Sequence, residues 1–299
     1  MRLNQIRDFI AAVEAGSLRA GARVIGVTQP AMTKSIRQLE AELQVKLLER
    51  SGRGAVATQA GKSFLARARV VQAELRKAAD DLQVFQGGAE SDAAFGVAPQ
   101  VCMLLVPETL QQFRRRYPYA RLRIVEGVST ALVEMVRNET LDFSIGMRAI
   151  NGPGAAMRFR PLFRPQLVVA GRKGHPLAAA TSLRDLAACS WLMYYPLGAG
   201  AMLEKAFNEA GAPMPRGIVQ CESYATALAL LANTDTLGLL MPQMLQDPYG
   251  RQRLQRMAVR EAIPAPLLGM FWRADAPLTP AANAMAQAVT AVARKLARP

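Results

Sequence analysis

The stretch VTQPAMTKSIRQLEAEL, residues 27–43, has two different faces when it is drawn as a helix. One face is apolar at the spacing of a helix packed on a core, and it consists of Met32, Ile36, Leu39 and Leu43. Thr28 is a candidate N-cap, and Pro30 falls in the first turn, where the missing N–H of a proline costs nothing. The opposite face is polar and consists of Gln29, Pro30, Thr33, Lys34 and Arg37. The pattern therefore predicts a packed helix with a polar side available for recognition.

The residues before this stretch predict two further helices joined by short turns. An apolar stripe indicates a helix at the N-terminus and consists of Leu3, Ile6, Phe9, Ile10 and Val13. Ser17 is a candidate cap for a short second helix, and Gly26 stands where that helix should end. So short a turn before Thr28 predicts a helix-turn-helix, whose second helix enters the major groove of DNA.

The polar face of the predicted recognition helix carries side chains that match bases. Gln29 can pair with adenine, and Lys34 or Arg37 can donate to guanine or to phosphate. The alternative is an ordinary surface helix, because any such helix has polar residues opposite its core stripe.

Residues 47–57 predict a β-hairpin after this helix. Leu47–Leu48 and Ala55–Ala57 would form its strands, and residues 51–54 its turn. A hairpin tipped with Arg53 is suited to contact the DNA backbone or the minor groove, although an exposed basic turn without a partner is the alternative. The residues predicted to contact duplex DNA are Ser17, Thr28, Gln29, Pro30, Thr33, Lys34, Arg37, Arg50 and Arg53.

Residues 59–86 predict a long helix, since they contain no proline and no glycine after Gly61. Their apolar residues are spaced 4, 3, 4, 3, 4, 3 and are Phe64, Ala68, Val71, Leu75, Ala78, Leu82 and Phe85. This spacing is typical of a coiled-coil seam and favours a dimer, which also suits DNA sites made of two halves. The alternative is a long helix packed on its own chain.

Beyond a linker at GGAESDAA, residues 87–94, strand-like and helix-like segments alternate. Such a rhythm is typical of an α/β protein with doubly wound parallel sheets, and this length is enough for two lobes. The predicted strands are AAFGVAP, RLRIVEG, LDFSIGMR, QLVVAGR, SWLMYYP, IVQCES, TLGLLMP and LLGMFWR.

The composition is basic, with 37 Lys and Arg against 23 Asp and Glu and a net charge of +14. Residues 1–87 hold 14 basic against 8 acidic residues, and residues 88–299 hold 23 against 15. A polyanionic partner is expected, although the charge alone also suits a membrane surface. The sequence contains no run of eighteen apolar residues, so no membrane span is expected. Asp8 and Glu14 interrupt the apolar N-terminus, so it does not resemble a signal peptide.

Three function classes are weighed against DNA binding. An enzyme has little support, because His175 is the only histidine, and no metal-ligand cluster or cofactor motif stands out. A periplasmic solute-binding protein would have a signal peptide and no N-terminal helices of this kind. A cysteine redox sensor is the third class, since Cys102 stands near a helix N-terminus that favours thiolate. Buried, inert thiols are the alternative for Cys102, Cys189 and Cys221, whose odd number and wide spacing indicate a reduced, cytoplasmic protein.

The whole chain resembles the LysR-type transcriptional regulators. The resemblance is most specific in FIAAVEAGSLRAGARVIGVTQPAMTKSIRQLEAELQVKLLER, residues 9–50, and in TQAG, residues 58–61. Gly21 stands where the family usually has alanine, and Ala57 where leucine is common. The resemblance implies a winged helix-turn-helix at residues 1–58, a dimerisation helix and hinge at 59–89, and an effector domain at 90–299. That domain would be periplasmic-binding-protein-like, with one lobe at about 90–161 and 266–299 and the other at about 162–265.

The same resemblance implies three partners: promoter DNA, a small-molecule effector and further copies of the chain in a tetramer built from dimers. RNA polymerase is a further candidate partner. No cofactor, metal or membrane is implied. Glycines and hydroxyls before helices, together with Arg148 after a strand, favour an organic anion as effector. An aromatic ring would suit the apolar wall that is available from Val101, Met103, Met147 and Tyr195. The alternatives to an effector site are that these glycines and hydroxyls are ordinary turn residues and that Arg148 forms a salt bridge. The predicted effector-binding residues are Ala98, Pro99, Gln100, Val101, Ser129, Thr130, Met147, Arg148, Tyr195, Gly198, Ala199, Gly200, Ser223 and Tyr224.

Overall fold

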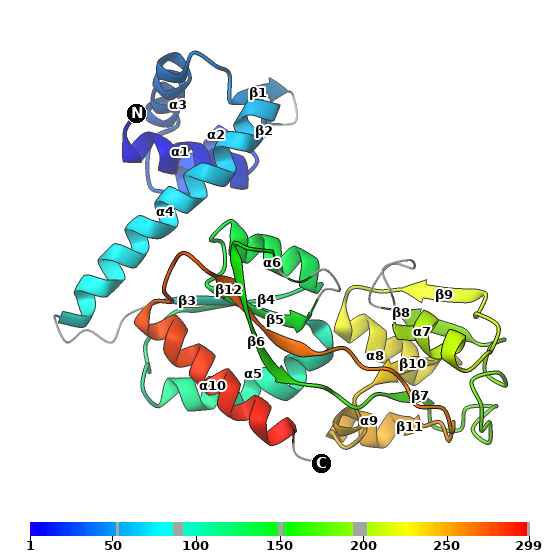
Figure 1. Cartoon of the computed structure of the whole chain (residues 1–299). Helices are drawn as coiled ribbons and strands as arrows, with labels where there is room; N and C mark the ends of the chain where they lie inside the picture. The colour runs from blue at the N-terminus through cyan, green and yellow to red at the C-terminus, as the bar shows by residue number, and fades with distance from the viewer. Residues whose placement is uncertain (52–53, 86–91, 149–151, 153, 194–201, 298–299) are drawn as a thin grey trace. The chain divides into compact units, whose positions relative to one another are not determined.

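The computed structural model describes the chain except for residues 52–53, 86–91, 149–151, 153, 194–201 and 298–299 (Figure 1). The side chains of residues 50, 51, 76, 77 and 79–85 are likewise outside the description. The chain divides into two compact units. One comprises residues 1–88 with 138–140, and the other comprises residues 89–137 with 141–299.

The N-terminal unit is a winged helix-turn-helix followed by a long helix. Ser17 Oγ accepts a hydrogen bond from the Ala20 N–H at 3.1 Å, and Thr28 Oγ1 accepts one from the Ala31 N–H at 3.4 Å, so both predicted caps are confirmed. Gly26 ends the second helix at φ +70°, a backbone conformation that favours glycine. The elements are α1 (Leu3–Glu14), α2 (Leu18–Val24), α3 (Gln29–Leu43), the antiparallel strands β1 (Leu48–Ser51) and β2 (Gly54–Ala57), and α4 (Gln59–Phe85).

The glycine at position 21 has a packing role. A Cβ atom there would lie 2.8 Å from the carbonyl oxygen of Ala11 and 2.9 Å from the Cα of Ala12, both backbone atoms of α1. Such contacts are closer than van der Waals distance, so α1 and α2 pack here through their backbones. This departure from the usual alanine is therefore built into the helix crossing.

The predicted seam along α4 is corrected in its first turns. The Phe64 ring meets the Phe9 ring of α1 edge-on with centroids 5.4 Å apart, and Ala68 is only 2% exposed within the same core. Both side chains thus pack on their own chain, which explains their apolar spacing without a partner. Val71 is 40% exposed and Leu75 is 46% exposed, so the dimerisation proposal now depends on these two, with the exposed Ala78 after them. The side chains of Leu82 and Phe85 lie outside the described residues.

The first lobe of the second unit is a five-stranded sheet between helices. Its buried face toward α5 and α10 includes Phe95, Phe143 and Met270, and on its other face Phe271 packs in one cluster with Leu132 of α6. The strand order is β4 (Leu122–Glu126), β3 (Ala93–Val97), β5 (Phe143–Met147), β12 (Leu268–Arg273) and β6 (Met157–Phe163). The helices are α5 (Pro99–Arg114), α6 (Ser129–Arg137) and α10 (Pro280–Leu296).

The second lobe is built around Trp191, which is fully buried and donates its indole N–H to the Leu186 carbonyl at 3.0 Å. Its strands are β10 (Gly238–Leu240), β7 (Val168–Arg172) and β11 (Leu254–Arg256) in one sheet, and β8 (Ser190–Met193) and β9 (Gly217–Gln220) in another. The remaining elements are α7 (Met202–Glu209), α8 (Tyr224–Asn233), the 3₁₀ helix η1 (Pro242–Leu245) and α9 (Pro248–Arg253).

The two-lobed α/β architecture agrees with the prediction, but the sheets are mixed and not wholly parallel. β3 is parallel to β4 and to β5, whereas β12 is antiparallel to both β5 and β6. The reason is the path of the chain: β12 returns from the second lobe, so it enters the sheet at the end where β5 leaves it. In the second lobe β7 is antiparallel to β10 and β11.

Two strands were missing from the predicted set, β6 and β11. β6 has the sequence MRFRPLF, in which arginines alternate with apolar residues and Pro161 stands inside the run. Proline and exposed charge are typical of an edge strand, and β6 does lie at the edge of its sheet.

Candidate nucleic-acid interface and ligand site

The polar face of α3 is exposed as predicted and slightly hollowed. Gln29, Lys34 and Arg37 are exposed, and within the described residues neither cation forms a salt bridge or a side-chain hydrogen bond. The residues that line the hollow are Gln29, Pro30, Thr33, Lys34, Arg37, Gln38 and Ala41. Gln38 and Ala41 were not in the predicted set, although extending the same helical face by one turn would have found them.

Two other residues predicted to contact DNA, Ser17 and Thr28, also cap helices. The oxygens of Ser17 and Thr28 accept the helix-capping N–H groups described above, which leaves each hydroxyl proton free to donate. Arg53 lies outside the described residues, and so does the side chain of Arg50.

A buried carboxylate connects α3 to the wing. Glu40 is 8% exposed, and its Oε1 accepts hydrogen bonds from the N–H groups of Leu47 and Leu48 at 2.9 and 3.1 Å. Its Oε2 receives the ammonium of Lys46 at 3.1 Å. Burial opposes ionisation, but these hydrogen bonds and the ammonium outweigh it and hold the pKa of Glu40 below its ordinary value. The carboxylate therefore fixes the start of the wing against the recognition helix.

Glu40→Ala should loosen this connection. The substitution leaves two buried N–H groups without an acceptor, and we expect the free energy of local opening to fall by about 2–5 kcal/mol. Amide hydrogen exchange of residues 44–57, followed by mass spectrometry, should show correspondingly faster exchange.

Lowering the pH should also loosen the wing in the wild-type chain. Because the folded-state pKa of Glu40 lies below its ordinary value, the ionised form stabilises the wing above that ordinary value. The contribution should be lost as the pH falls further, through the folded-state value. Glu40→Gln, which keeps one acceptor and no charge, is the control. Equal pH dependence in wild type and Glu40→Gln would contradict this role of the carboxylate.

Two of the predicted effector residues lie where the lobes of the second unit meet. Val101 of α5 and Tyr224 of α8 belong to one buried apolar cluster that spans both lobes. Ala98 is the N-cap residue of α5 and Pro99 its first residue. The side-chain amide of Gln100 is buried at both Oε1 and Nε2, and neither atom has a hydrogen-bond partner within the described part of the chain. Such a group is unusual, because buried amides are nearly always satisfied.

At the end of β5, Ser129 and Met147 are directly linked, since Ser129 Oγ accepts a hydrogen bond from the Met147 N–H at 2.9 Å. Thr130 is exposed beside them. Arg148 is exposed, its backbone N–H bonds to the Leu267 carbonyl, and its guanidinium lies 5.6 Å from the centroid of the Phe159 ring. The structure thus brings Ser129 and Met147 together and places the Arg148 side chain against β6.

Glu126 is a residue that the sequence analysis missed. It ends β4, and its Oε1 accepts a hydrogen bond from the Tyr224 N–H, at the start of α8 in the other lobe, at 3.1 Å. Ser223 caps the same helix by accepting a hydrogen bond from the Thr226 N–H. A carboxylate from the first lobe is therefore placed at the α8 N-terminus. The partners are 98 residues apart, so no local signal could have paired them.

Cys102 and Cys189 do not fit the redox-sensor alternative. Burial and the neighbouring Glu126 carboxylate, 3.6 Å from the Cys102 sulfur, raise the pKa of that thiol to about 12. Burial and Asp235 also raise the pKa of Cys189. A reactive thiol requires a lowered pKa, so the thiolate that a helix N-terminus favours is not realised at Cys102.

His175 is buried, although its sequence context, KGHPLA, predicts a surface turn. Its Nδ1 accepts a hydrogen bond from the Leu177 N–H, and its Nε2 lies 3.1 Å from the Asp235 carbonyl oxygen. Both ring nitrogens are therefore engaged by backbone groups, which gives His175 a structural role.

Tyr195 and the predicted glycine-rich turn of Gly198, Ala199 and Gly200 lie outside the described residues. In the described part of the chain, no group of three or more candidate ligands could hold a metal ion. None of the helices described there combines the length and the apolar character that crossing a membrane requires.

A winged helix-turn-helix with an exposed polar recognition face, joined in sequence to a two-lobed α/β body, defines a DNA-binding regulator with a ligand-binding domain. Comparison with known proteins agrees. The family model "Bacterial regulatory helix-turn-helix protein, lysR family" matches residues 3–62, and "LysR substrate binding domain" matches residues 86–294. The chain belongs to the LysR family of transcriptional regulators. It is therefore a regulator of transcription and not an enzyme.

Individual relatives are distant but match along their length. The HTH-type transcriptional regulator GbpR of Azospirillum brasilense is 26% identical over 298 residues, which is 97% of this chain and 86% of the relative. The crystal structure of CbnR, a LysR family regulator, aligns over 100% of both chains with a TM-score of 0.72 and 20% identity. Full-length CbnR complexed with its target DNA aligns over 98% of this chain and 100% of that one, with a TM-score of 0.69 and 19% identity. These two structures have a fold similar to that of this chain.

Proposed function

We propose that this regulator binds promoter DNA through the polar face of α3. The observation that carries this is the exposed set of Gln29, Lys34 and Arg37 on a helix whose other side is fully buried at Met32 and Leu39. CbnR, a protein of the same fold, has been crystallised with its target DNA. The regulator would act in the cytoplasm, as dimers that pair into tetramers, and RNA polymerase would be a further partner.

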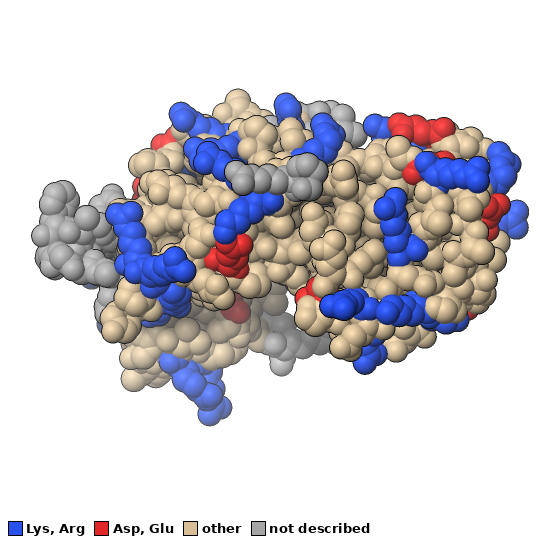
Figure 2. Space-filling view, turned by 90° about the horizontal axis from the view of Figure 1, so that it is seen from below, with Lys and Arg blue, Asp and Glu red and all other residues tan. Residues whose placement is uncertain are grey.

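We further propose that a small organic anion, with an aromatic ring as one form, controls this binding from the lobe junction. The main support is the buried amide of Gln100, which lacks a protein partner among the described residues and would be satisfied by a polar ligand. The basic excess of residues 88–299 favours an anion. Figure 2 shows Lys and Arg spread over the displayed face of the chain, with Asp and Glu between them.

The Glu126 carboxylate restricts how such an anion could lie. Since it already receives the Tyr224 N–H, the α8 N-terminus is not open to a second negative charge. The anionic group would therefore lie toward Arg148. Arg148 would have to turn away from Phe159, and that stacking is worth only about 0.5–1 kcal/mol at an exposed site. A bidentate, charge-assisted pair with a carboxylate is stronger.

A thermal-shift experiment tests the effector proposal. Benzoate and benzenesulfonate are compared with benzamide, on wild type and on Arg148→Ala. At about 100 times its dissociation constant a ligand stabilises the folded state by about 2.7 kcal/mol, which corresponds to about 5–10 °C for a domain of this size. We expect the carboxylate or the sulfonate to give the shift and benzamide to give little.

Arg158→Ala is the matched control, because Arg158 is also an exposed arginine of the first lobe and has no described partner. It should leave the shift intact, whereas Arg148→Ala should abolish it. If benzamide stabilises the protein as well as benzoate does, or if Arg148→Ala keeps the full shift, the anion proposal is wrong.

A further inference from the structure

A basic surface forms where the turn after β7, the helix α9 and the strand β11 meet in the second lobe. β11 pairs with β7, which puts Leu254 opposite Arg172, and the Lys173 N–H donates to the Arg253 carbonyl at 2.8 Å. α9 leads directly into β11, so its last turn adds Arg251 and Arg253. The exposed cations here are Lys173, Arg251, Arg253 and Arg256, and together they are called the β11 surface.

None of these four side chains forms a salt bridge or a hydrogen bond within the described part of the chain. The adjacent Arg172 differs, because Asp235 engages it at 2.7 Å. The Arg253 guanidinium lies 5.3 Å from the centroid of the Tyr249 ring. Stacking orients a guanidinium and leaves the N–H groups of its edge available to a phosphate or a carboxylate. The β11 surface is therefore free to receive an anionic partner.

The composition of this surface favours phosphate over an acidic protein. No large apolar side chain is exposed in residues 168–176 or 248–260, where Leu254 and Met257 are buried. Protein interfaces usually have an apolar or aromatic centre, whereas sequence-independent DNA binding depends on cations that contact phosphates.

The spacing of the arginines also suits a DNA strand. Arg253 and Arg256 are three residues apart in the chain, so their Cα atoms lie no more than about 11 Å from each other. Successive phosphates of one strand advance by about 3.4 Å along the axis of the duplex. The two arginines can therefore contact nearby phosphates of the same strand.

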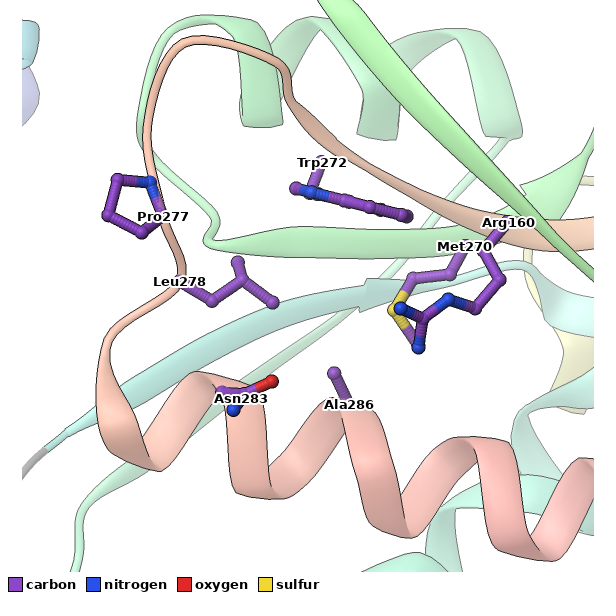
Figure 3. A pocket seen from close by; sticks show the side chains of 7 residues that line it. All are labelled: Arg160, Met270, Trp272, Pro277, Leu278, Asn283 and Ala286. Atoms are coloured by element: carbon purple, nitrogen blue, oxygen red, sulfur yellow. The ribbon is translucent and has the colours of Figure 1, made fainter.

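An arginine of the first lobe shows the contrast. The Arg160 guanidinium carbon lies 5.4 Å from the centroid of the Trp272 ring, and the side chain lines a pocket of about 260 Å³ (Figure 3). A rigid duplex is far too wide to enter such a pocket, and none of the four cations of the β11 surface lines it. Arg160 is therefore a suitable control for the loss of positive charge.

We propose that the β11 surface binds the phosphate backbone of duplex DNA without regard to its sequence. Its cations would contact phosphate oxygens, and no base would be read. This contact is independent of the recognition helix α3, which belongs to the other unit. It would raise the affinity for DNA of any sequence and make that affinity depend more steeply on salt, because each neutralised phosphate releases counterions.

The experiment uses the full-length chain with Lys34→Ala and Arg37→Ala, which reduces the contribution of α3. Fluorescence anisotropy measures binding to a labelled duplex of about 60 base pairs, about six helical turns, that lacks the operator. Changing Arg251, Arg253 and Arg256 to glutamine should lower the affinity by about tenfold or more at low salt. The slope of log K against log salt should become shallower by about 2–3, since each lost phosphate contact removes about 0.9.

Two matched variants complete the experiment. Changing the same three arginines to lysine keeps their charge, so the salt slope should stay close to that of the parent chain. Changing Arg115, Arg116 and Arg160 to glutamine removes the same charge from the first lobe and should leave the slope unchanged. Arg116 and Arg160 also stack on aromatic rings, as Arg253 does, so this control covers the loss of stacking.

Four results would overturn the proposal. Three of them are an unchanged slope in the glutamine variant, an equal loss in the first-lobe control, and a loss in the lysine variant as large as that in the glutamine variant. The fourth is a glutamine variant that loses affinity for poly-L-glutamate and keeps its full affinity for DNA, which would indicate an acidic protein as the partner. Recognition by α3 is tested separately with the operator, so either proposal can fail alone.

Discussion

Replacing both Lys34 and Arg37 with alanine is expected to lower the affinity for the operator by about 30-fold or more. A side chain that contacts a base contributes about 1–3 kcal/mol, so two such losses amount to about 2–6 kcal/mol. Both side chains are exposed on α3 and lack salt bridges among the described residues, so the loss should come from DNA contacts and not from unfolding. Fluorescence anisotropy with a labelled operator, repeated at several salt concentrations, measures both the affinity and the salt dependence.

The control removes the same charge from the other unit. Arg115 and Arg116 are exposed in the second unit, and changing both to alanine should leave operator binding close to that of wild type. If the Lys34 and Arg37 double variant instead kept full affinity with an unchanged salt slope, α3 would not be the recognition helix.

Changing Val71 and Leu75 to aspartate is expected to dissociate the oligomer. These side chains are 40% and 46% exposed in the single chain, so their apolar surface is available to a partner helix. Two carboxylates buried between helices without counter-charges cost several kcal/mol. Sedimentation velocity should show a smaller species, and its operator binding should be weaker because two recognition helices are no longer held together.

Gln72→Asp serves as the control, because Gln72 is exposed on the same helix and lies outside the seam. It should leave the oligomer intact. An unchanged sedimentation coefficient in the Val71 and Leu75 double variant would refute the seam.

The N-terminal unit was the most predictable part of the molecule because its signals are local. The caps at Ser17 and Thr28 and the stop at Gly26 each act within three residues of their own position. The length of α4 also followed from the absence of helix breakers. What the spacing could not reveal is which neighbour covers each turn of α4. Phe64 and Ala68 have the same spacing as Val71 and Leu75, yet they pack on α1 of their own chain.

In the second unit, strand positions were more predictable than strand directions. A run such as LLGMFWR predicts β12, but its antiparallel place between β5 and β6 depends on a return from the other lobe. The candidate sites show the same limit. Gln100 was found because it follows a strand, whereas Glu126 at Tyr224 and Lys173 beside Arg253 depend on contacts between distant segments.

The position of β12 has a consequence for how the chain is made. Because β12 joins β5 to β6 in the middle of the sheet, that sheet cannot be completed until residue 273 has left the ribosome. The winged helix-turn-helix has all its core residues by Ala68, so it can fold while most of the chain is still unmade. A message or protein cut short anywhere between these points would release a finished DNA-binding head attached to an incomplete body. Such fragments would have recognition helices without a complete first lobe, and those long enough to include β5 and β6 would expose the unpaired edges of these strands to aggregation.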